Sequence, residues 1–164
     1  MVVKRRDGQV SLIVIEWKYT ECYSGKCLSI SDKGTNRVEI YRSLLEEPEC
    51  PIRVGDHERL FFDPYYQLMR QTLLAWQMIK HRELGATDWV HVHVAPKANV
   101  QLLEIITSPR LTGFRTMEDA WNSVLVEPGK YRLVSPHEVL PSIESNNDMD
   151  RWLTWLAERY SVNS

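Results

Sequence analysis

The sequence predicts an α/β domain in which a small mixed sheet carries helices on its faces. Two observations predict this class. The first is a strand over residues 9–18 that is apolar on both sides, with Leu12 and Val14 on one face and Ile13 and Ile15 on the other, which is typical of a covered central strand in an α/β sheet. The second is the order of elements along the chain, β-β-α-α-β-α-β-α-α, in which strands alternate with helices.

Length and composition define the broad class of the protein. The chain has 164 residues, of which 43% are hydrophobic, so we expect a single domain over residues 1–164 with a substantial core. The formal net charge is −2, which argues against non-specific coating of nucleic acid but allows a local basic groove. Apolar runs are far shorter than the roughly 20 residues of a membrane span, and the charged start is unlike a signal peptide. The three cysteines, an odd number, indicate reduced thiols, so we expect a cytoplasmic protein without a membrane segment.

The first element is a β-hairpin over residues 1–18. A first short strand ends at Asp7-Gly8, the strongest signal for a two-residue turn. The return strand then reaches Lys18. Residues 19–33 form a polar loop that contains glycine and serine, and residues 36–46 form a short helix.

The clearest helix covers residues 64–84. Asp63 stands where an N-cap belongs, Pro64 takes the first helical position, and Gly85 closes the far end. One face of this helix is polar. A stripe at helical spacing predicts the buried face, formed by Leu68, Met69, Thr72, Ala75, Trp76 and Ile79.

The remaining elements follow at short intervals. An alternating β-branched run predicts a strand over residues 88–96, a helix follows near residues 117–125, and a second strand covers residues 130–134. A proline opens a turn of helix at residues 136–140. We expect residues 150–160 to form an amphipathic, tryptophan-containing end helix.

Glu16 and Lys18 form the pair that carries the chemistry. Residues two apart on a strand face the same way, about 6.8 Å apart along it, so a carboxylate and an ammonium emerge together at the end of an apolar strand. A buried charge is costly unless it is paired or holds a metal. Mg²⁺ prefers oxygen ligands such as Glu16, and Lys18 could orient an attacking water or offset the charge on a phosphoryl group. A surface salt bridge at a strand end, with a structural role only, is the alternative interpretation.

Two segments carry a resemblance to a known family. Residues 10–21, VSLIVIEWKYTE, resemble the E-x-K strand of the PD-(D/E)XK nuclease superfamily, the restriction-endonuclease-like fold. Residues 65–75, YYQLMRQTLLA, resemble the helix that follows this strand in bacterial restriction-like nucleases. The resemblance covers about residues 1–100 and implies Mg²⁺-dependent (or Mn²⁺-dependent) hydrolysis of DNA phosphodiesters.

The resemblance also implies roles for individual residues. Glu16 and the main-chain carbonyl of Trp17 would bind the metal, and Lys18 would assist the attacking water. Gln67 and Gln71 are the positions that could complete the catalytic site from the helix. We expect Lys18 and Arg70 to contact DNA.

One part of the superfamily pattern is missing. The first metal-binding Asp of the superfamily lies on a strand before the E-x-K strand, but only fifteen residues precede Glu16 here, and Asp7 is the only acid among them. Asp7 lies at the other end of the strand, roughly 30 Å from Glu16. We therefore expect the fold to be N-terminally truncated, so that the protein is either an enzyme with a misplaced start or an inactive relative.

Other functions remain open. A non-catalytic nuclease-like module that binds DNA or a protein partner is the main alternative, and a homodimer formed by the end helix is another. His91 and His93 share a strand face and could bind zinc, although hydrogen-bonded core histidines are favoured. Ordinary thiols are favoured over a zinc site at Cys22 and Cys27. The basic clusters at residues 4–6 and 80–82 are most simply solvated faces.

Overall fold

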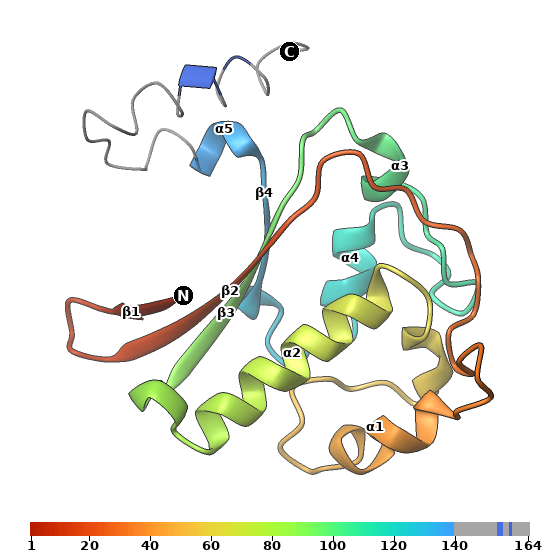
Figure 1. Ribbon diagram of the computed structural model, residues 1–164, viewed down its shortest axis with the longest axis horizontal. Coiled ribbons are helices and arrows are strands. Elements are labelled where there is room, and N and C mark those ends of the chain that lie inside the picture. The colour runs from red at the N-terminus through yellow and green to blue at the C-terminus, as the bar shows by residue number, and fades with distance from the viewer. Residues whose placement is uncertain (140–153, 156–157, 159–164) are drawn as a thin grey trace.

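The structure is a computed structural model that describes residues 1–139, 154–155 and 158. It confirms the expected fold class, a mixed four-stranded sheet flanked by helices (Figure 1). The strands are β1 (Val2–Lys4), β2 (Val10–Trp17), β3 (Asp88–Val94) and β4 (Tyr131–Val134). The helices are α1 (Arg37–Leu45), α2 (Tyr65–Lys80), α3 (Val100–Leu103), α4 (Met117–Asn122) and α5 (Pro136–Val139), of which α3 was not expected.

The N-terminal hairpin forms as the sequence predicts, with a slightly longer turn. Strands β1 and β2 are antiparallel, and Lys4 pairs with Val10. The Arg5 amide donates to the carbonyl of Gln9, so the loop contains three residues rather than two. Gly8 has a φ of 87°, which a residue with a side chain rarely adopts, and this matches a turn followed by a bulge.

The sheet order is β1-β2-β3-β4, and the two central strands run in parallel. Strand β4 is also parallel to β3. Because β2 and β3 are paired from Ser11–Asp88 to Trp17–Val94, their carboxyl ends meet at the same edge. Glu16 lies directly opposite His93 in this register. Residues at the ends of these strands are therefore brought together although they are far apart in sequence.

Helix α2 packs across one face of the sheet (Figure 1). Its sheet-facing side joins Ala75 to Leu12 and Trp89 in a small apolar cluster. Its other apolar side belongs to the main core, with α1 and α4, through buried residues that include Leu68, Met69, Leu73, Trp76 and Trp121. The helix lies antiparallel to β2, so its N-terminal half reaches the carboxyl end of that strand (Figure 1).

Both ends of α2 differ from the prediction. Pro64, not Asp63, stands at the N-cap position, and no side chain caps the first turn. The helix therefore begins at Tyr65, one residue later than expected, and the Asp63 carboxylate does not cap it. At the other end the helix stops at Lys80, because Arg82 and Leu84 take left-handed backbone angles and a short 3₁₀ turn follows.

The second face of β2 is less covered than its sequence suggested. Ile15 is 51% exposed and Trp17 is 37% exposed, whereas Leu12 on the opposite face is 5% exposed. The described helices pack mainly on the side of α2, which explains the difference. The apolar pattern of β2 therefore correctly predicted a central strand, but not a strand covered on both sides.

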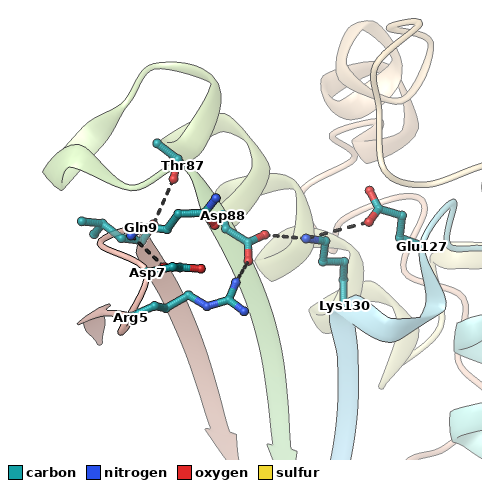
Figure 2. Close-up of polar contacts among 8 residues, drawn as sticks. Arg5, Asp7, Gln9, Thr87, Asp88, Glu127 and Lys130 are labelled. Carbon is teal, nitrogen blue, oxygen red and sulfur yellow. Dashed lines mark hydrogen bonds and ion pairs between the residues drawn. The ribbon is translucent and has the colours of Figure 1, made fainter.

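Ion pairs join the strands at the end of the sheet farthest from Glu16. Asp88, the first residue of β3, binds Arg5 from the hairpin turn at 3.2 Å and also pairs with Lys130 just before β4 (Figure 2). Asp7 lies in the same region and accepts a hydrogen bond from the Gln9 amide. The hairpin, β3 and the start of β4 are thus tied together by one carboxylate.

The expected C-terminal helix over residues 150–160 lies largely outside the described residues, because the structure describes only residues 154, 155 and 158 of this range. The homodimer expectation that rests on it therefore stays a prediction. Among the residues that the structure describes, no helix is long and apolar enough to cross a membrane.

Candidate functional site

Glu16 and Lys18 meet at the carboxyl end of β2. Their side chains emerge on the face that packs against α2, and the Lys18 ammonium lies 2.6 Å from Glu16 Oε1. The Glu16 side chain is only 14% exposed, and the Lys18 side chain is only 10% exposed. The Lys18 amide donates to the carbonyl of Val94, which anchors this chain end to β3. The pair is therefore a largely buried ion pair in a fixed backbone frame, not the exposed strand-end salt bridge of the structural alternative.

Helix α2 supplies two amide side chains to this pair. Lys18 Nζ donates to Gln67 Oε1 at 2.9 Å. One turn further along, Gln71 hydrogen-bonds Glu16. The polar flank of α2 expected from the sequence therefore faces the charged strand end, and all four residues singled out for catalysis lie together.

Tyr23, from the loop after β2, is a member of the site that the sequence did not suggest. Its hydroxyl lies 3.5 Å from Gln67 Oε1, and its ring centroid is 5.7 Å from the Lys18 ammonium. Asn99 fixes the start of this loop by donating to the carbonyls of Tyr19 and Glu21. Long-range loop packing of this kind leaves no periodic signal in the sequence.

Glu16 and Lys18 are both charged at neutral pH. Burial alone would raise the pKa of Glu16, but hydrogen bonds from Lys18 and Gln71 and the charge of Lys18 outweigh it, so the pKa is lowered. Burial would lower the pKa of Lys18, but its bonds to Glu16 and Tyr23 outweigh it and the pKa is raised. Glu16 is therefore a carboxylate and Lys18 an ammonium.

Trp17 lies between the two charged residues as the last residue of β2, opposite Val94. Its side chain points to the other face of the sheet because side chains alternate along a strand. Its main-chain carbonyl lies between Glu16 and Lys18 in the backbone at this strand end.

Arg70 lies on the exposed side of α2, next to the site. Its guanidinium is 5.5 Å from the centre of the Tyr66 ring, and that of Arg37 is 5.4 Å from the same ring. Within the described part of the chain, neither arginine has an acidic partner in an ion pair. Arg70 also lines an open groove of about 490 Å³, together with Tyr41, Gln67, Gln71 and Leu74. Arg37, Arg70 and the ring between them form a basic and aromatic surface beside the buried pair, which we call the Arg37–Arg70 surface.

The two histidines of β3 are buried against the same interior. His93 Nδ1 is 2.9 Å from the Tyr131 hydroxyl, as expected of a core histidine. The prediction is wrong for His91, because neither of its ring nitrogens has a hydrogen-bond partner among the described residues. Burial lowers the pKa of each histidine to about 4, so both are neutral at pH 7.

The remaining candidates of the sequence are the cysteines and the two basic clusters. Cys22 and Cys27 are exposed free thiols. Over residues 1–139 and the few described beyond them, no three or more His, Cys, Asp or Glu side chains form a group that could hold a metal. In the basic clusters, Arg5 pairs with Asp88 and Lys80 pairs with Glu47. These contacts agree with structural roles for both clusters.

This arrangement, a buried Glu-x-Lys pair on an α/β sheet, defines a restriction-endonuclease-like domain. A comparison with known families agrees: residues 1–161 match the family described as Restriction Endonuclease associating with ARP, and the chain belongs to this family. Neither the curated proteins nor the solved structures contain a match.

Proposed function

We propose that this chain is a DNA endonuclease of the PD-(D/E)XK type that hydrolyses phosphodiester bonds with Mg²⁺ or Mn²⁺ as cofactor. The observation that supports the proposal best is the buried Glu16–Lys18 pair, held by Gln67 and Gln71 at the common edge of two parallel strands. A buried ion pair needs further hydrogen bonds to offset its desolvation, and the two amides supply them here. They also hold both charges in one geometry, as a preorganised site requires.

The donor set suits a hard divalent cation. Glu16 Oε2 and Gln71 Oε1 are buried oxygen atoms that have no hydrogen-bond partner among the described residues. Such atoms are costly unless a ligand satisfies them, and oxygen is the atom that Mg²⁺ prefers. Glu16, Gln71 and the carbonyl of Trp17 would hold the ion. A bound divalent cation supplies Lewis-acid polarisation of the phosphodiester.

Lys18 acts through its charge. Because its pKa is raised, the side chain stays protonated at neutral pH and cannot accept a proton from water. It instead donates hydrogen bonds and places positive charge where the phosphoryl group becomes more negative. Gln67 fixes the direction of the ammonium through the bond at 2.9 Å.

The Arg37–Arg70 surface supports DNA as the substrate. A guanidinium that lacks an acidic partner binds phosphate well. Two of them flank the Tyr66 ring, and Arg70 lines the groove. Phosphate contacts position a duplex without reading its sequence. Because the net charge of the chain is −2, the positive charge that binds DNA must be gathered locally, as on the Arg37–Arg70 surface.

Nicking of supercoiled plasmid in Mg²⁺ tests the proposal. We expect Glu16→Gln and Lys18→Met each to reduce the nicking rate by at least about 100-fold, the cost of losing one preorganised charge-stabilising group. Lys26→Met is the matched control, because Lys26 is 64% exposed and pairs with the exposed Asp32. Unchanged nicking by both site variants would overturn the assignment of the site, and absence of nicking by the wild-type chain with any divalent metal would overturn the enzymatic function.

A second candidate is a non-catalytic nuclease-like module. The observation that favours it is the family description itself, which names an association with a partner called ARP. In this case the chain would form a stable complex or bind DNA in a salt-dependent way, without cleavage in any divalent metal. Co-purification with the partner together with the nicking assay separates the two candidates.

A further inference from the structure

Three arginines line a pocket that is separate from the Glu16–Lys18 site. The pocket has a volume of about 300 Å³, and the described charged residues that line it are all arginines, Arg53, Arg59 and Arg110. None of the residues assigned above to catalysis or to DNA binding lines it. This cavity, which we call the arginine pocket, therefore has a chemistry of its own.

Hydrogen bonds between distant segments fix the walls of the arginine pocket. The Arg53 amide donates to the carbonyl of Val124 at 2.7 Å. The Ser108 hydroxyl donates to the carbonyl of Arg59 at 3.0 Å, and Arg110 follows Ser108 by two residues. Each arginine thus lies on or beside a segment that is bonded to another part of the fold, so the pocket is formed before a ligand binds.

The positive charge of the pocket is only partly compensated. Arg110 pairs with Asp56 and Glu58, both at 2.7 Å, and neither acid lines the pocket. The Arg53 guanidinium donates to two main-chain carbonyls. Among the described residues, neither Arg53 nor Arg59 has an acidic partner in an ion pair. Two of the three guanidinium groups therefore lack a counter-charge, which favours an anion in the pocket.

The lining and the size of the pocket narrow the class of anion. A guanidinium presents its N–H donors in a planar fork that matches the oxygens of a phosphate group. A volume of about 300 Å³ stands at the lower end of the range for small-molecule sites and suits a single nucleotide. Phe114, which is partly buried, also lines the pocket and supplies an aromatic ring on which a base can stack.

We propose that the arginine pocket binds a nucleoside monophosphate, with its phosphate held by the three arginines and its base against Phe114. Arg110 is the donor that Asp56 and Glu58 orient, while Arg53 and Arg59 supply the uncompensated charge. The inference goes beyond the proposed function and does not depend on it, because the pocket shares no lining residue with the catalytic site.

Binding of adenosine monophosphate to the full chain, measured by isothermal titration calorimetry, tests the proposal. We expect Arg59→Gln to weaken binding by at least about tenfold, through loss of charge-assisted hydrogen bonds. Arg6→Gln is the matched control, because Arg6 is an exposed arginine in the hairpin turn and its loss changes the net charge equally. Melting curves check that each variant is folded, and Arg59→Lys, which keeps the charge, should recover part of the affinity if Arg59→Gln folds poorly.

Two simpler ligands test the two halves of the proposed site. Adenosine, which lacks the phosphate, should bind at least about tenfold more weakly than adenosine monophosphate. Inorganic phosphate, which lacks the base, should bind at least about fivefold more weakly. Phe114→Leu should weaken binding of the nucleotide but not of inorganic phosphate. Equal affinity for inorganic phosphate and the nucleotide would overturn the assignment of a nucleoside ligand.

Four other results would overturn the inference. The first is no binding of adenosine monophosphate to the wild-type chain at millimolar concentrations. The second is unchanged binding in both Arg59→Gln and Arg53→Gln. The third is an equal loss in Arg6→Gln, because net charge alone would then explain the effect. The fourth is binding that is lost in Arg70→Gln and kept in Arg59→Gln, which would move the nucleotide to the Arg37–Arg70 surface. Plasmid nicking stays unchanged in Arg59→Gln under the proposal, so failure of this inference leaves the nuclease assignment standing.

Discussion

The Glu16–Lys18 pair makes a quantitative prediction about stability. At 2.6 Å, and with an effective dielectric constant of about 20, the attraction between the charges is about 6 kcal/mol. Lys18→Met removes it and leaves the Glu16 carboxylate buried and uncompensated. Breaking a buried pair in this way costs about 3–5 kcal/mol, out of a typical total of about 5–15 kcal/mol. For 164 residues this lowers the melting temperature by about 10 °C.

The pH dependence of the stability lost in Lys18→Met shows whether the loss comes from the Glu16 carboxylate. The folded-state pKa of Glu16 is lowered, so its pairing stabilises the fold above the unfolded-state value of 4.5 and is lost as the pH falls through the folded value. In Lys18→Met the same carboxyl keeps its burial but loses its partner, so its pKa rises. The difference in stability between wild type and variant should therefore shrink toward acid pH.

Urea denaturation followed by tryptophan fluorescence measures both effects. Lys26→Met, at an exposed pair of similar chemistry, should cost less than about 1 kcal/mol. The double variant Glu16→Gln with Lys18→Met should be more stable than Lys18→Met alone, because it removes the uncompensated charge. A Lys18→Met chain as stable as the wild type at pH 7 would refute the conclusion that the pair is buried and coupled.

Three further predictions concern the neighbourhood of the site. Wild-type stability should fall as the pH drops from about 6.5 to 4, because the unfolded chain protonates His91 and His93 while the fold holds each pKa at about 4. His91→Phe should reduce the slope of melting temperature against pH in this range. An identical slope in the variant would contradict the prediction. Tyr131→Phe should cost about 1 kcal/mol in urea denaturation through the lost bond to His93 Nδ1, and full stability would contradict this. Arg70→Ala should lower the slope of log affinity against log salt for duplex DNA by about 1 in fluorescence anisotropy, whereas Arg6→Ala, in the hairpin turn, should not.

The sequence predicts the local part of the site well. Strand alternation is enough to place Glu16 and Lys18 on one face, and helical spacing is enough to place Gln67 and Gln71 on one flank. Both patterns depend on residues close together in the chain. The pairing of the flank with the strand end then follows from burial of the apolar faces of α2 and β2.

The sequence does not predict the contacts that depend on tertiary packing. Asp63 was expected to cap α2, as its position before a proline suggests, but the backbone of Pro64 takes that position. Tyr23 lies in a loop without periodicity, and the pairing of Glu16 with His93 depends on the register of β2 and β3, seventy-seven positions apart in the chain. The exposure of Ile15 follows from the helix packing and not from the pattern of β2.

The register of β2 determines which side of the sheet carries Glu16 and Lys18. Side chains alternate along β2, so a shift of one residue in its pairing would move Glu16 to the face now occupied by Ile15, away from α2 and both glutamines. The three-residue loop closed between Arg5 and Gln9, and the ion pair of Arg5 with Asp88, hold that pairing from the opposite end of the strand. Because the pairing of β2 with β3 also holds this register, a single insertion before Val10 would shift β1 and leave Glu16 on the face of α2.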